Sequence, residues 1–258
     1  MRTMKAIGAG TKFVAALVAC AGLATHAAGD IHLGSAQSFA VLGGQTVTNT
    51  GPTVITGDLG VWPGNTATGF PPGIVNGSIH LGDAVAQQAQ ADALVGYNFL
   101  ASLAPTMDLT GTDLGGLTLT PGVYFFSSSA FLTGTLTLDA QGDPDALFVF
   151  QIGSTLITGS NSSVVGINDA TGCDAWWQVG SSTTLGTGTD FMGTIIAHTS
   201  ITLNTDASII HGRAFALNGS TTLDSNIIDA GPCIPTPSAF TLLGAACFGS
   251  LISRRRTT

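Results

Sequence analysis

Charged side chains are scarce in this sequence, and glutamate is absent. Charged residues make up 9% of the 258-residue chain, and six of its seven lysines and arginines lie in the two end segments. Between residues 29 and 232, Arg213 stands alone against fifteen aspartates, so the net charge of this part is near −14 with histidine neutral. Nucleic acids and anionic membrane surfaces are bound largely through lysine and arginine. We therefore expect no nucleic-acid partner.

The residue types that catalysis requires are also sparse. A polysaccharide-cleaving β-solenoid needs a base, usually lysine or arginine, close to clustered acids, and residues 29–232 contain no lysine. Arg213, two residues after His211, is expected to be solvated or paired with an aspartate. The segment "DAQGDPD" at 139–145 is typical of a turn. The other histidines of this part lack the spacing of metal ligands: they are His32, His80 and His198. The sequence predicts no enzyme, no cofactor and no metal site.

The N-terminal residues 1–28 form a targeting pattern. Three basic residues precede an apolar run over 13–23, and small residues follow. This order is typical of a secretory signal peptide, and we expect cleavage after Ala27 or Ala28. The motif "LVAC", which ends at Cys20, leaves lipidation of that cysteine as the alternative.

The C-terminal residues 233–258 contain a second targeting pattern. Pro235-Thr236-Pro237 precedes an apolar stretch at 239–252 and then three arginines. This order resembles the PEP-CTERM sorting tail of Gram-negative bacteria, although Thr236 replaces the usual glutamate. The apolar stretch is shorter than the about 20 residues of a bilayer span. We expect transient membrane anchoring and a protein that is secreted or on the cell surface of a Gram-negative-type bacterium; a plain tail anchor is the alternative.

Two cysteines remain. Cys173 lies between the end segments, and Cys233 is the first residue of the C-terminal segment. In an exported protein an even pair predicts one disulfide. A metal site is the poorer interpretation, since no histidine lies near either cysteine in the sequence.

Short apolar strands followed by a Thr-Leu-x-Thr or Thr-Leu-x-Ser unit recur from residue 148 onward. The units begin 29, 18 and 20 residues apart, and a period of 18–20 is typical of one coil of a β-solenoid. We expect the leucines of successive units to stack inside and the adjacent first threonines to point outward. The units comprise Thr155 and Thr158, Thr184 and Thr187, Thr202 and Thr205, and Thr222 and Ser225.

One segment has a helical period instead. Residues 82–103 place apolar side chains on one face of a helix, with Asp83 suited to its N-terminus and Pro105 ending it. The face predicted to pack consists of Val85, Ala89, Ala93, Tyr97 and Leu100. Upstream, 39–64 predicts three short strands that are too few for a separate domain.

These segments together resemble the microbial ice-binding protein family. The resemblance covers about residues 33–229 and rests on long segments such as "FAVLGGQTVTNTGPTVITGDLGVWPG" and "MGTIIAHTSITLNTDASIIHGRAFALNGSTTLD". It implies an all-β solenoid: an irregular, discontinuous, right-handed three-sided β-helix with one long α-helix along one wall. It also implies that the N-terminal strands lie beside the last C-terminal coil. The expected domain is 29–232.

The resemblance implies that a flat, Thr-rich face binds ice or an ordered water surface. A threonine ladder at about 4.8 Å spacing offers evenly placed hydroxyl and methyl groups with few rotamers. We expect Thr184, Thr202 and Thr222 to form it, with Thr155 as a candidate continuation and the last residue of each unit beyond a corner. The alternative is a non-catalytic adhesion protein of the extracellular matrix that binds polysaccharide. Exposed aromatic rings would favour this alternative, and the candidates are Trp62 and whichever of Trp176 and Trp177 points outward.

Overall fold

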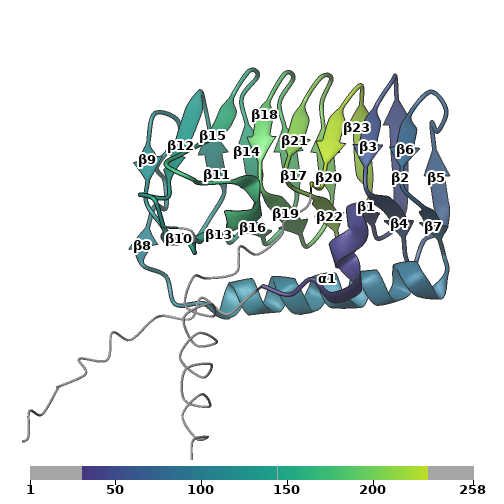
Figure 1. Ribbon diagram of the computed structural model, residues 1–258, viewed down its shortest axis with the longest axis horizontal. Coiled ribbons are helices and arrows are strands. Elements are labelled where there is room, and N and C mark those ends of the chain that lie inside the picture. Colours follow the sequence, from purple (N-terminus) through teal and green to yellow (C-terminus); the bar gives the residue numbers. More distant parts are fainter. Residues whose placement is uncertain (1–30, 144, 232–258) are drawn as a thin grey trace, which may run out of the picture. The chain divides into compact units, whose positions relative to one another are not determined.

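Three parallel β-sheets and one helix make up the part of the chain that the structure describes. The structure is a computed structural model that describes residues 31–143 and 145–231. Each coil of the chain adds one strand to each sheet in turn, which produces a three-sided solenoid (Figure 1). The expected all-β solenoid with one helix is confirmed.

The strands are short and differ little in length between coils. Sheet A contains, in spatial order, β7 (Ile79–Leu81), β4 (Asp58–Val61), β1 (Phe39–Gly43), β22 (Ala214–Ala216), β19 (Thr194–Ala197), β16 (Ala175–Val179), β13 (Phe148–Ile152), β10 (Gly122–Phe126) and β8 (Met107–Asp108). Sheet B contains β11 (Ala130–Leu132), β14 (Leu156–Thr158), β17 (Thr183–Leu185), β20 (Ile201–Leu203), β23 (Thr221–Asp224), β2 (Thr46–Thr50) and β5 (Thr66–Thr68). Sheet C contains β6 (Ile74–Asn76), β3 (Val54–Thr56), β24 (Ile227–Asp229), β21 (Ser208–Ile210), β18 (Asp190–Met192), β15 (Ser163–Ile167), β12 (Thr135–Asp139) and β9 (Thr118–Leu119).

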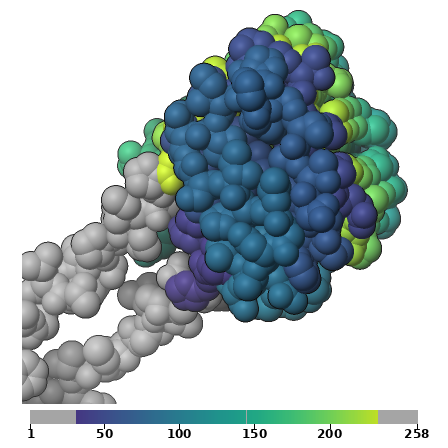
Figure 2. Space-filling model, turned by 90° about the vertical axis from the view of Figure 1, so that its right-hand side faces the viewer, coloured from purple at the N-terminus to yellow at the C-terminus, as the bar shows by residue number. Residues whose placement is uncertain are grey.

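The order of coils in space differs from their order in the sequence. The first strands β1, β2 and β3 pair in parallel with the last strands β22, β23 and β24. The next coil, β4 to β6, lies outside them and, with β7, forms the end of the solenoid that faces the viewer in Figure 2. The N-terminal region, in which four strands replace the expected three, therefore completes the solenoid beside its last C-terminal coil.

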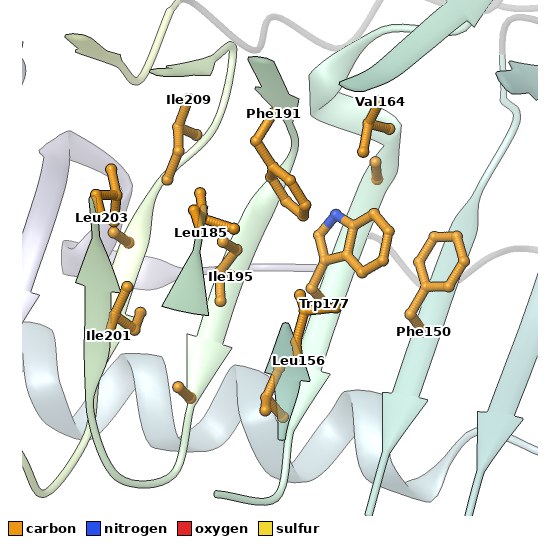
Figure 3. Packing of buried hydrophobic residues seen from close by; sticks show 14 of the residues in the cluster. Phe150, Leu156, Val164, Trp177, Leu185, Phe191, Ile195, Ile201, Leu203 and Ile209 are labelled. Carbon is orange, nitrogen blue, oxygen red and sulfur yellow. The ribbon is translucent and has the colours of Figure 1, made fainter. Parts of the chain in front are cut away.

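The interior between the three sheets is apolar. Leu185, Leu203 and Leu223, the expected inward stack, are at most 1% exposed. Aromatic rings pack against one another in the core, where the ring centroids of Phe150 and Trp177 lie 3.8 Å apart and nearly parallel (Figure 3). Apolar burial of this kind is the main source of stability in a fold whose surface carries few ion pairs.

Helix α1 (Ala84–Ser102) covers the outer surface of sheet A (Figure 1). Its N-cap is Asp83, whose carboxylate accepts a hydrogen bond of 2.8 Å from the backbone N–H of Ala86. The buried side of α1 has small side chains, so the helix approaches the sheet closely; this side contains Ala86, Ala89, Gln90, Ala93, Gly96 and Leu100. The 3₁₀ helix η1 (Gly34–Ser38) packs against α1.

Two details differ from the sequence-based expectations. Val85 is 47% exposed, because the buried side of α1 is centred on Ala86, Ala89 and Ala93. Trp176 and Trp177 point to opposite faces of β16, but both are buried. Trp177 lies in the core and Trp176 lies under α1, which covers the outer face of sheet A.

Candidate functional site

Sheet B presents a row of threonines to solvent. Read from β11 to β5, the residues that share one registered position are Phe131, Ile157, Thr184, Thr202, Thr222, Thr48 and Thr68. Five consecutive strands thus carry threonine, and we call these five residues the threonine ladder. Neighbouring strands in a sheet lie about 4.8 Å apart, so the ladder is evenly spaced along the solenoid axis.

A second row of hydroxyl groups runs beside the threonine ladder. It lies two residues earlier on each coil, about 6.6 Å along the strand, and we call it the hydroxyl row. Its members are Ser129, Thr155, Ser182, Ser200, Ser220, Thr46 and Thr66. The Oγ1 of Thr155 donates to the Oγ of Ser129 at 2.7 Å, and the Oγ1 of Thr46 donates to the Oγ of Ser220 at 2.9 Å. Contacts between neighbouring coils therefore hold part of this row in place.

The hydroxyls of the threonine ladder are largely left to solvent. The Oγ1 atoms of Thr48 and Thr222 are 3.4 Å apart, while those of Thr184, Thr202 and Thr68 bond to no other group within the described residues. Thr222 and Thr68 are exposed and the other three are half-buried by their neighbours. A β-branched side chain has few rotamers, so the hydroxyl and methyl positions are well defined.

The first repeat unit does not continue the ladder. Ile157 registers with Thr184, so Thr155 lies in the hydroxyl row instead. Thr158 is 4% exposed, and its hydroxyl lies 2.8 Å from that of Thr189 inside the solenoid. Its predicted place on the face is wrong, because unit 155–158 is offset by two residues from the later units.

The last residues of the other three units lie in turns beyond the strands. Thr187 and Thr205 are exposed, and the hydroxyl of Thr205 donates to the carboxylate of Asp224. Ser225 is half-buried with a φ of 56°. These three residues flank the two rows, and their contact with a ligand stays a prediction, as does that of Thr184, Thr202 and Thr222.

Sequence reasoning missed Thr48 and Thr68 of the ladder and every member of the hydroxyl row except Thr155. The alternating "TVTNT" of β2 and "TAT" of β5 resemble the later repeats in composition. A signal therefore existed, but it lay far from the repeats in the chain.

Charge is nearly absent from this face. Asp224 is the one charged residue within the strands of sheet B, at the end of β23 beside the corner. Sheet C differs, because its outward positions mix the aspartates Asp139, Asp190 and Asp229 with exposed apolar residues such as Ile227 and Ile74. The two uncovered sheets of the solenoid are thus chemically distinct.

Other kinds of site were also sought among the described residues. In residues 31–143 and 145–231 no group of three or more His, Cys, Asp or Glu side chains could hold a metal ion. No helix in that part is long and apolar enough to cross a membrane. Arg213 is 3% exposed and donates to the carbonyl of Gln37 at 3.0 Å, so its side chain is not solvated, and pairing with an aspartate stays a prediction. Cys233 and the targeting segments 1–28 and 233–258 lie outside the described residues.

Comparisons with known proteins agree with this geometry. A family model described as "Ice-binding-like" matches residues 41–229. An ice-binding protein of Nostoc sp. (strain HG1) is 58% identical over 235 residues, which cover 87% of this chain and 86% of the relative. The crystal structure of an ice-binding protein from an Antarctic biological consortium has 48% identity and a TM-score of 0.75, covering 78% of this chain and 90% of that one. That of an ice-binding protein from the Antarctic ascomycete Antarctomyces psychrotrophicus has 41% identity and a TM-score of 0.74, covering 77% and 97%.

The described residues form a three-sided solenoid with one wall covered by a helix and another lined by registered hydroxyls. The chain belongs to the ice-binding-like family.

Proposed function

We propose that this protein binds ice through the threonine ladder and the hydroxyl row of sheet B. The proposal rests on one observation: threonine occupies the same registered position on five consecutive strands of sheet B. Two of these strands, β2 and β5, come from the N-terminal part of the domain, and the other three come from its C-terminal part. The family and the names of its relatives support the same function. The role is one of binding, with no catalytic step.

The physical basis is the match between a rigid surface and ordered water. Each threonine offers a hydroxyl that can bond to a water of the lattice and a methyl group that does not disturb it. Threonine has few rotamers and loses little entropy on contact. Lysine or glutamate at these positions would be mobile and would order water around a charge instead. A protein held on the crystal by many such contacts restrains ice growth and recrystallisation.

We further propose that the protein acts outside the cytoplasm. The signal pattern at 1–28 supports export, and the tail at 233–258 supports transient anchoring through 239–252 before release or display. The adhesion alternative, with extracellular polysaccharide as partner, receives less support. Trp176 and Trp177, which could have stacked on sugars, are at most 8% exposed, and Trp62 is half-buried.

The test is observation of single ice crystals in a solution of purified residues 29–232. We expect faceted crystals and a gap between the melting and freezing temperatures, that is, thermal hysteresis. A folded domain that leaves crystals as rounded discs with no hysteresis would overturn the proposal and leave the adhesion alternative.

A further inference from the structure

The threonine ladder is shorter than the sheet that carries it. Sheet B has seven strands, but on the two beyond the β17 end of the ladder, β14 and β11, the registered residues are Ile157 and Phe131. Their side chains are 38% and 48% exposed. Two large apolar groups therefore occupy the positions at which the pattern would place threonine.

The backbone does not explain where the ladder stops. Ile157 pairs with Thr184 and Phe131 pairs with Ile157 in unbroken parallel register. The hydroxyl row continues across the same strands, since Thr155 and Ser129 are joined by a 2.7 Å hydrogen bond. The strand pairing and the hydroxyl row thus remain regular at Ile157 and Phe131, and only the side chains at the ladder position change.

Phe131 ends the flat surface by its size. Side chains of a strand stand roughly perpendicular to the sheet, so a phenyl ring projects further than the neighbouring threonines. A crystal plane resting on the ladder would meet this ring at the last strand of the sheet, β11. Ile157, the intermediate position, has methyl groups but no hydroxyl for a lattice water.

A carboxylate lies directly beyond the ring. Asp113 forms a parallel bridge with Phe131, and one of its oxygens accepts hydrogen bonds from the backbone N–H groups of Gly115 (2.8 Å) and Thr133 (2.9 Å). Partial burial alone would raise the pKa of Asp113, but these hydrogen bonds outweigh it and lower the pKa. The group is therefore charged at neutral pH, and its hydration shell marks the same boundary.

We propose that Phe131 and Ile157 set the edge of the ice-contacting surface and limit its area. The inference rests on the proposed function and deepens it: these two residues determine how many strands of sheet B can contact a crystal plane at once. Replacing both by threonine should extend the ladder from five strands to all seven.

The test compares the exported protein with its Phe131→Thr, Ile157→Thr double variant. Both side chains point outward and threonine suits a strand, so the fold should be kept. If each added threonine contributes one hydrogen bond net of water, as on the rest of the ladder, the protein concentration needed for a given hysteresis should fall about fivefold. The matched control is Ile227→Thr, which replaces a 53% exposed apolar residue on sheet C and should leave hysteresis unchanged.

The outcomes separate this inference from the function on which it rests. An unmodified protein that does not shape ice refutes the function itself. An active unmodified protein with a folded double variant of equal or lower hysteresis overturns the inference, because the apolar residues would then be neutral or useful contacts. An equal gain in Ile227→Thr would overturn it as well, since the effect would not belong to sheet B. Circular dichroism and thermal melting verify folding in each case.

Discussion

Replacing Thr202 by tyrosine tests the threonine ladder at its centre. Thr202 is registered with Thr184 on one side and Thr222 on the other, and its side chain points away from the core. The phenol ring should stand above the plane of the neighbouring hydroxyls. Folding should be nearly unaffected, since surface substitutions usually change stability by less than about 0.5 kcal/mol.

The size of the effect follows from the spacing of the strands. Thr184 and Thr222 lie about 4.8 Å from Thr202, within reach of a tyrosine ring, so three of the five ladder positions lose contact with the crystal. At about 0.5 kcal/mol each, the lower end for a hydrogen bond net of water, the loss is about 1.5 kcal/mol, or roughly tenfold in adsorption.

The assay is thermal hysteresis against concentration, with Thr56→Tyr as the matched control. Thr56 is an exposed strand residue of sheet C, registered between Asp229 and Asn76. The control should keep full activity, while Thr202→Tyr should need about ten times more protein for the same hysteresis. A folded Thr202→Tyr protein with unreduced activity would falsify the assignment of ice contact to this face.

Three other changes test separate parts of the structure. Thr48→Tyr should reduce hysteresis as strongly as Thr202→Tyr, because Thr48 is registered between Thr222 and Thr68; full activity in the folded variant would exclude the N-terminal strands from the face. Trp177→Ala should lower the free energy of unfolding by about 3–5 kcal/mol, measured with denaturant, because a fully buried ring stacked in the core is removed; a loss below about 1 kcal/mol would contradict the packing. Replacing Cys173 and Cys233 together by serine should cost about 2–4 kcal/mol in unfolding experiments if the predicted disulfide forms, and alkylation of both thiols in the folded, exported protein would show that it does not.

The repeat units predicted the later coils well because those coils follow one another without insertions. Thr184, Thr202 and Thr222 are spaced by 18 and 20 residues and do share a register. Every interval between units contains one strand of sheet C and one of sheet A, but the interval after Thr155 also contains the 3₁₀ helix η2 (Gly172–Asp174), and this is why its unit misled. A similar local motif does not ensure the same register when the connection changes length.

Strand alternation predicted the direction of side chains but not what covers them. Trp176 and Trp177 do point to opposite faces of β16, as a period of two requires. Whether an outward side chain meets water depends on which wall α1 covers. That is decided by tertiary packing, and no pattern within 175–179 contains the information.

The continuity of the threonine ladder depends on the junction between the last coil and the first strands. The hydrogen bond between Thr48 and Thr222 joins residues 174 positions apart, so local sequence patterns could not reveal it. Sliding β2 by one residue would turn Thr48 into the core and Val47 to the solvent.

Buried hydrogen bonds at the junction oppose such a slip. The Oγ1 of Thr221 donates to the carbonyl of Leu42 at 2.9 Å, and the backbone N–H of Asn226 donates to the Oγ1 of Thr53 at 3.0 Å. Thr221, Asn226 and Thr53 are at most 1% exposed, and a buried polar group that loses its partner costs about 1–3 kcal/mol. A wrong register would break both bonds. These inward polar residues therefore align the two separate runs of outward threonines, and the flatness of the face is fixed from inside the solenoid.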